Sequence, residues 1–161
     1  LEEASSAAGS PKVITQERIL LTASTSVSIE SDGTRHDEII NVSTVNESVP
    51  HIVFSVGRHD LYIHRFSVAL QDCGSTTNPY SFKLFHSTAA EYQAYTLGHT
   101  VGTLTLTPTS ANSPLFGSAA SSGNQTVSAG DVLALAVGSA PSSGSGGQQL
   151  HVTIEATRAV V

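Results

Sequence analysis

Residues 126–161 constrain the fold of this chain more than any other stretch, because they contain two runs with the side-chain period of a β-strand. Positions 132–137 are apolar throughout, which predicts a strand buried on both faces. Positions 150–157 alternate apolar with polar residues, which predicts a strand buried on one face. A turn is predicted at Ala129-Gly130-Asp131, since glycine adopts positive φ at no steric cost, and the Ser/Gly-rich residues 140–147 predict an exposed loop.

Further stretches with the period of a strand recur upstream at intervals of about ten residues. The predicted strands are 13–22, 25–30, 37–45, a segment from Pro50 to Val56, 61–70, 80–87 and 101–107. Turn signals separate them, of which the clearest are Asp32-Gly33 and residues 57–60. Residues 89–98 are expected to form a helical turn or a long loop. Residues 108–124 predict a long loop with Phe116 as an aromatic plug.

This pattern predicts an all-β protein, a jelly-roll-like antiparallel β-sandwich of about 8–10 strands with a flexible N-terminal arm. An immunoglobulin-type sandwich is the alternative, but the chain has no tryptophan and only one cysteine. A length of 161 residues predicts a single domain. We expect residues 13–161 to form it, and residues 1–12, which lack apolar periodicity, to form the arm.

The composition excludes some classes of partner. Charged residues make up 12% of the chain, against about 25% in a typical domain, and the net charge is −6. Nucleic acid is therefore not an expected partner, because its binding depends on Lys and Arg that neutralise phosphates. No membrane partner is expected either, since the apolar run 132–137 is far shorter than the roughly 20 residues of a bilayer span.

Cysteine and histidine are the residues that most often bind metals, and here they predict no metal site. The single cysteine, Cys73, excludes an intramolecular disulfide and is expected to be a small, semi-buried side chain near a loop. His59 and His64 are separated by an odd spacing, which places them on opposite faces of an extended strand. His64 and His86 would meet only if their strands paired in register. We expect structural or solvated histidines, with a pH-responsive interface as a lesser alternative.

Catalytic motifs are lacking in the sequence. There is no Gly-x-Ser-x-Gly elbow, no phosphate-cradling loop and no dinucleotide fingerprint. The carboxylates, such as Asp60, Asp72 and Asp131, fall in turns or at strand ends, where Asp131 is expected to bond the turn backbone. We therefore expect no enzyme, no catalytic residue and no cofactor.

The C-terminal segment resembles the last hairpin of jelly-roll modules. The residues that carry the resemblance are 127–135 (VSAGDVLAL) and 150–154 (LHVTI), a small-Gly-Asp turn and an apolar strand followed by a terminal strand. The same pattern occurs in C1q/TNF-like domains and in bacteriophage fibre, head-decoration and cement proteins. The scarcity of aromatic residues, five Phe and four Tyr, favours the viral kind. The resemblance implies a homo-oligomeric, non-enzymatic structural module.

These observations together predict a virion structural protein, a capsid decoration or cement protein that binds and stabilises a capsid surface as a dimer or trimer. Its expected partners are further copies of itself and a major capsid protein. Its expected location is the capsid surface of the virion, or otherwise the extracellular space. The predicted partner-interface arm comprises Leu1, Ala4, Pro11, Val13 and Ile14. The alternative is a glycan-binding, lectin-like or fibre-tip module, with aromatic and amide contacts from Tyr92, Tyr95, Asn112 and Phe116.

Overall fold

The computed structural model describes residues 15–25, 52–75, 77, 79–94, 98–139 and 148–160. The predictions made for residues 1–12, 26–45 and 140–147 therefore lie outside the described residues. Within them the chain forms nine strands and one short helix, which confirms the all-β class. The elements are β1 (Thr15–Thr25), β2 (Ile52–Ser55), β3 (Leu61–Asp72), β4 (Tyr80–Ser87), α1 (Ala89–Gln93), β5 (His99–Leu106), β6 (Leu115–Ala120), β7 (Thr126–Val127), β8 (Val132–Ser139) and β9 (Gln148–Val160).

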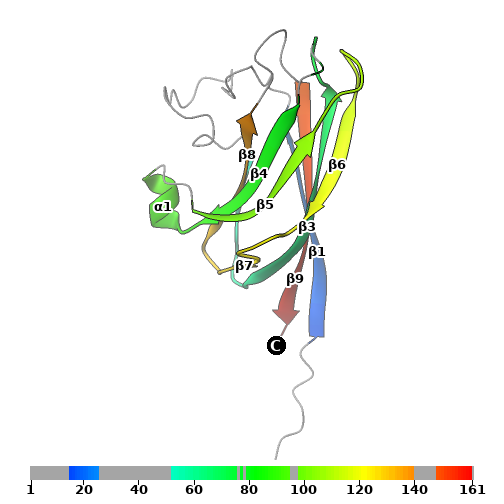
Figure 1. The fold of residues 1–161 in the computed structure, drawn as a ribbon. Helices are drawn as coiled ribbons and strands as arrows, with labels where there is room; N and C mark the ends of the chain where they lie inside the picture. The colour runs from blue at the N-terminus through cyan, green and yellow to red at the C-terminus, as the bar shows by residue number, and fades with distance from the viewer. Residues whose placement is uncertain are drawn as a thin grey trace, which may run out of the picture.

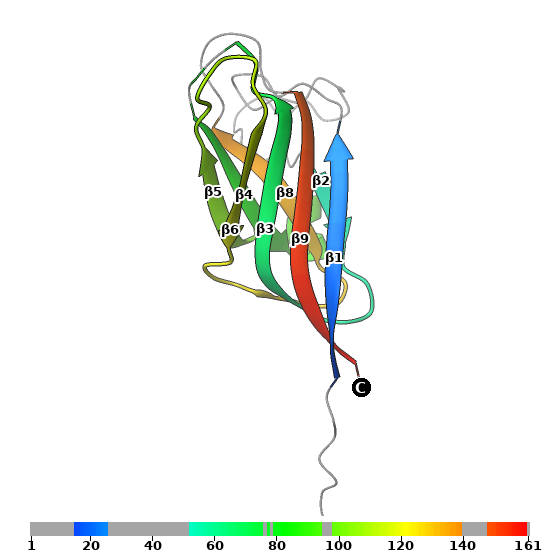
Figure 2. The same cartoon turned by 90° about the vertical axis from the view of Figure 1, so that its right-hand side faces the viewer.

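The strands form two antiparallel sheets that pack face to face (Figures 1 and 2). One, the β9 sheet, has the order β1-β9-β3-β6 with β7 beside β3, and the other, the β8 sheet, has the order β2-β8-β4-β5. With the short β7 set aside, the pairing is nested: β1 pairs with β9, β2 with β8, β3 with β6 and β4 with β5. One long hairpin rolled up on itself gives this nesting, and the fold is therefore a jelly roll, as predicted.

The two C-terminal strands do not form a hairpin, which corrects the interpretation of residues 127–154. β8 pairs with β2 and β4, whereas β9 pairs with β1 and β3, so the segment between them passes from one sheet to the other. Burial gives the reason. Ala134 and Ala136 on the outer side of β8 are as buried as Leu133 and Leu135 on its inner side, and each strand fills a central place in its own sheet. The predicted burial, two-sided for β8 and one-sided for β9, is confirmed.

The inner faces of both sheets supply one core. Its largest fully buried side chains include Phe66 and Ile154 from the β9 sheet and Phe82 and Leu135 from the β8 sheet. Strand β3 keeps its apolar residues inward on both sides of a bulge at residues 63–65, where its register with β9 shifts. A bulge adds one residue to one strand and reverses the phase of its side chains. The predicted inward positions 66, 68 and 70 are confirmed, and the bulge adds Ile63 to the same face.

The prediction of a long loop over residues 108–124 is wrong, because β6 lies within it and pairs with β3. The proposed plug, Phe116, is 73% exposed, since Leu115 points inward and the next side chain of a strand must point outward. A six-residue strand of Leu, Phe, Gly, Ser and Ala has little β propensity of its own. Its small residues instead fit a close approach between the sheets: a Cβ on Gly117 would overlap the side chain of Leu106 in β5.

Replacing Gly117 tests this close approach. We expect Gly117→Val to lower the free energy of unfolding by about 1 kcal/mol, because the added carbons would displace the end of the Leu106 side chain. The outward-facing and exposed Ala120 of the same strand provides the control, since Ala120→Val should change stability by less than about 0.5 kcal/mol. Urea titrations of both variants measure the difference. Equal stability of the two variants would contradict the close packing at Gly117.

Candidate functional site

The solvent side of the β9 sheet, here called the outer face, carries a row of hydroxyl groups across four strands. Thr22 of β1 lies opposite Thr153 of β9, Thr153 lies opposite Ser67 of β3, and Ser67 lies opposite Ser118 of β6. Residues directly opposite each other in a sheet point to the same face, so the four hydroxyls form one line. Figure 2 shows these four strands side by side in front of the β8 sheet.

Two rows lie beside the hydroxyl row. They are Leu20, Glu155, Arg65 and Ala120 on one side of it, and Ser24, His151, Ala69 and Phe116 on the other. A further row on the same face, beyond that of Leu20, holds Arg18, Thr157 and Tyr62. Arg65 donates a hydrogen bond from Nη2 to Ser118 Oγ (3.2 Å). Large apolar side chains stand at the two edges, where Leu20 is 66% exposed and Phe116 is 73% exposed. The Asp, Glu, Lys and Arg residues of these rows are Arg18, Arg65 and Glu155, and the other positions are mostly hydroxyl-bearing or apolar.

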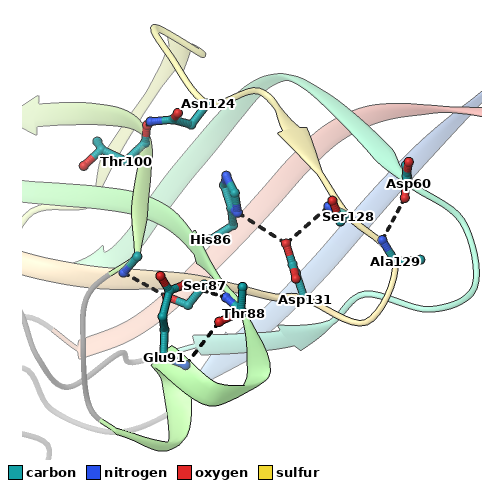
Figure 3. Close-up of polar contacts among 11 residues, drawn as sticks. Asp60, His86, Ser87, Thr88, Glu91, Thr100, Asn124, Ser128, Ala129 and Asp131 are labelled. Atoms are coloured by element: carbon teal, nitrogen blue, oxygen red, sulfur yellow. Dashed lines mark hydrogen bonds and ion pairs between the residues drawn. The ribbon is translucent and has the colours of Figure 1, made fainter.

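A second polar region, the His86 corner, lies at one end of the sandwich (Figure 3). His86 at the end of β4 pairs in register with His99 at the start of β5, with ring centroids 5.0 Å apart. Its Nδ1 lies 3.6 Å from Asp131 Oδ2, just before β8. That distance is too long for a hydrogen bond, and the buried Nδ1 has no hydrogen-bond partner among the described residues.

Asp131 organises the turn that was predicted from residues 129–131. Its Oδ2 accepts a hydrogen bond from the backbone N–H of Ser128 (3.3 Å), and Gly130 has a φ of +88°, as the prediction required. The backbone oxygen of Asp131 also accepts the N–H of Val56 (2.9 Å), which attaches the turn to the end of β2. His86 therefore sits against a turn that is itself fixed by hydrogen bonds.

Helix α1 begins at the same corner with a capping box. Glu91 N donates to Thr88 Oγ1 (3.2 Å), and Thr88 N donates to Glu91 Oε2 (2.8 Å). These hydrogen bonds lower the pKa of Glu91, with smaller contributions from the nearby His99 and His86. The Thr-x-x-Glu spacing of residues 88–91 was visible in the sequence and would have located the helix start.

The pKa of His86 is lowered from its ordinary value of 6.5, mainly because burial penalises the charged imidazolium. The neighbouring His99 lowers it further, whereas Asp131 and Glu91 raise it by a smaller amount. His86 is consequently held neutral near pH 7, beside a carboxylate that it does not hydrogen-bond. The arrangement is that of a structural histidine.

The described residues of the His86 corner form neither a nucleophile–base pair nor a metal-ligand set. Ser87 is fully buried, and its Oγ accepts the backbone N–H of Gly98 (2.9 Å) instead of donating to a base. In the described part of the chain, no three His, Cys, Asp or Glu residues converge on one point. His64 does not meet His86, because β3 and β4 lie in different sheets, and its Nε2 contacts Thr157 Oγ1 (3.1 Å). Cys73 is fully buried rather than semi-buried.

The structure places Tyr92 apart from Asn112 and Phe116 among the predicted glycan contacts. Tyr92 lies on α1, which joins β4 to β5, whereas Asn112 lies in the turn that joins β5 to β6, so the two are at opposite ends of β5. Asn112 is exposed with a φ of +52°, and Phe116 follows it at the start of β6. Tyr95 lies outside the described residues. So do the predicted arm residues Leu1, Ala4, Pro11, Val13 and Ile14.

Sequence reasoning missed both the outer-face rows and the His86–His99 pair, because both depend on strand register. The alternating Thr and Ser residues of 150–157 were a visible signal for one strand of the outer face. The neighbours of that strand, however, come from positions near 20, 67 and 118, and no local pattern connects them. None of the helices in the described part of the chain is long and apolar enough to cross a bilayer.

The sequence matches no protein-family model and no curated protein. The structure is similar to the globular domain of zebrafish complement 1qA protein, at 10% identity and a TM-score of 0.37 over 89% of this chain and 96% of that one. It is also similar to the Eiger TNF of S. frugiperda (15%, TM-score 0.37, 83% and 84%). A third similar structure is the virus-like particle of Macrobrachium rosenbergii nodavirus (10%, TM-score 0.35, 93% and 97%). C1q/TNF-like domains and viral shells are both among these structures, and the likeness concerns the fold.

The lowered pKa of His86 predicts a loss of stability in mild acid. The unfolded state takes up the His86 proton as the pH falls through about 6.5, whereas the folded state takes it up only at lower pH, so unfolding becomes more favourable. We expect the free energy of unfolding to fall between pH 8 and pH 5.5, and the fall to be smaller in His86→Gln. The pKa of Glu91, lowered from 4.5, acts only in stronger acid.

The control is His59→Gln, which removes an exposed histidine from the turn after β2. Urea titrations at both pH values should give this variant the same pH dependence as the wild type. If His86→Gln also retained the full fall in stability, the role of His86 would be refuted.

Proposed function

We propose that this protein is a non-enzymatic structural module that binds the outside of a protein shell as an oligomer, in the manner of a capsid decoration or cement protein. The outer face of the β9 sheet is the observation that carries the proposal. It presents Thr22, Thr153, Ser67 and Ser118 in one row, with exposed Leu20 and Phe116 at its two edges. Residues 129–131 adopt the turn that was one part of the resemblance to C1q/TNF-like and virion modules, although the two strands that follow do not pair as a hairpin.

A surface of this kind suits protein association. Charged groups must lose water when they are buried in an interface, and this loss often cancels the attraction that they gain. Hydroxyl groups are less costly to bury, and each can donate or accept, so they can match varied partner groups. The cores of protein interfaces are accordingly depleted in charge. The hydroxyl row is the part of the outer face that we place at the centre of the contact.

A catalytic role is not favoured. The shifted pKa values of His86 and Glu91 both arise mainly from burial or hydrogen bonds within the His86 corner. Perturbed titration is a sign of an active site only when the groups face a cleft. Here Glu91 caps α1, while His86 packs between His99 and Asp131.

The arm proposed for residues 1–12, with the segment around Val13 and Ile14, would add a second contact. Strand β1 begins at Thr15 directly after it. A chain segment that enters an edge strand is placed to pair with a neighbouring sheet, and main-chain hydrogen bonds would then provide the affinity. This part of the proposal makes Leu1, Ala4 and Pro11 contact residues of a neighbouring subunit or of a major capsid protein.

Immunogold electron microscopy of particles purified from the source organism tests the function. We expect an antibody against this chain to label the outside of intact particles, and recombinant protein to rebind particles from which it has been stripped. Deletion of residues 1–12 should weaken that rebinding, and unchanged rebinding would remove the arm from the proposal. Particles without label would refute the function itself.

A glycan-binding module is the second candidate, and the exposure of Phe116 favours it. An aromatic ring that is 73% exposed, next to the turn that holds Asn112, offers a face on which a sugar can stack. If this is the function, a glycan array gives hits that Phe116→Ala weakens about tenfold or more and that Leu20→Ala, at the opposite edge, leaves unchanged. An array without hits, or hits that survive Phe116→Ala, would count against this candidate.

A further inference from the structure

Strand β1 is the edge of the β9 sheet, and one side of its backbone faces away from the sheet (Figure 2). Among the described residues, β9 is the strand that pairs with β1, over the whole of Thr15–Thr25. Backbone N–H and C=O groups alternate between the two sides of a strand, so about half of those in β1 point outward from the sheet. An edge strand of this length is a template for another strand.

The inward side chains of β1 are only partly covered by the described part of the chain. Ile19, Leu21 and Ala23 point inward and contact the core, yet they are only partly buried. Leu104 and Ala119 at the opposite edge are partly buried as well, but β6 there approaches β5 so closely that a Cβ on Gly117 would overlap the side chain of Leu106. A second strand laid along β1 would cover its inward side chains as well as its backbone.

The usual features that prevent edge pairing are weak in β1. Residues 19–25 contain no charge, no proline and no bulge. The charge of Glu17 is matched within the chain, since Arg158 Nη2 lies 2.6 Å and Nε 2.7 Å from its Oε2. Arg18 is the one charge of β1 without such a match in the described structure.

The register of a second copy follows from the faces of the strand. An antiparallel pairing must place inward residues opposite inward residues, and full overlap places Thr15 opposite the partner's Thr25. Leu20 then faces the partner's Leu20 on the twofold axis, and Arg18 faces the partner's Thr22. No like charges oppose each other in this register, and roughly ten backbone hydrogen bonds can form.

We propose that two copies of this chain pair antiparallel along β1, with Leu20 at the twofold axis, and so join their β9 sheets into one continuous sheet. This contact would form the oligomer that the proposed function requires, and the inference rests on the proposed function in that respect alone. The contact is isologous, so it closes at a dimer and does not propagate into a filament. The outer faces of the two copies then form one wider hydroxyl-rich surface.

Cysteine crosslinking tests both the contact and its register. Leu20→Cys should form a disulfide-linked dimer in oxidised glutathione, because directly opposed residues on paired strands bring their Cβ atoms within about 5.5 Å. Arg18→Cys and Thr22→Cys should crosslink when the two variants are mixed, but neither should do so alone. Wild-type protein is the control, since its single cysteine, Cys73, is buried. A crosslink in either single variant but not in Leu20→Cys would overturn the register.

A charged residue at the twofold axis tests the contact without any covalent crosslink. Sedimentation velocity should show a dimer whose dissociation constant rises about tenfold or more in Leu20→Lys, because like charges then oppose each other. Phe116→Lys, at the other edge of the same face, should leave the dissociation constant of the dimer unchanged. Circular dichroism should show that both variants are folded, since both positions are exposed.

A wild-type protein that stays monomeric, or a dimer weakened only by Phe116→Lys, would overturn the inference. These results are separable from those on function. A β1 dimer without particle labelling removes the proposed function alone. Particle labelling by a chain that neither dimerises nor crosslinks removes the β1 contact alone.

Discussion

The pairing of β9 with β1 on one side and β3 on the other holds the β9 sheet together. Residues 150, 152, 154 and 156 of β9 point into the core, while His151, Thr153, Glu155 and Thr157 form the middle of the outer face. One strand therefore supplies both the apolar contacts that stabilise the sandwich and the polar row that we propose as its contact surface. Register links the two roles, because a slip of one residue would move Thr153 into the core and Ile154 into solvent.

The strands that the sequence predicted well are those in which burial follows a simple period. β8 and β9 are examples, since an apolar run and a clean alternation are the direct marks of two-sided and one-sided burial. β6 was missed because its small, weakly β-forming residues are selected by the closeness of β5, which is a property of the folded chain. The error about the C-terminal hairpin has a similar origin. Local alternation identifies a strand but does not identify its neighbour.

The candidate sites were predictable to a smaller extent. The turn at residues 129–131 followed from its Gly-Asp pair. The Thr-x-x-Glu spacing that forms the capping box at Thr88 was present in the sequence, but the helix start was not predicted from it. The outer face, in contrast, needed the register of four strands. Its three pairings join residues 51, 86 and 131 positions apart, namely Ser67 with Ser118, Ser67 with Thr153, and Thr22 with Thr153. Tyr92 and Asn112 show the converse: aromatic and amide residues that look similar in sequence were separated by the length of a whole strand.

Low charge has opposite consequences on the outer face and at the β1 edge of this molecule. In the β9 sheet it leaves few groups whose desolvation would oppose a contact, and that favours association over the outer face. On an edge strand the same lack of charge removes the common protection against unwanted pairing. β1 combines an uncharged stretch, partly buried core residues and an exposed Leu20 in eleven residues. An edge of this kind is protected from further strand pairing when a defined partner covers it. An isologous partner does so in an assembly that closes at a dimer.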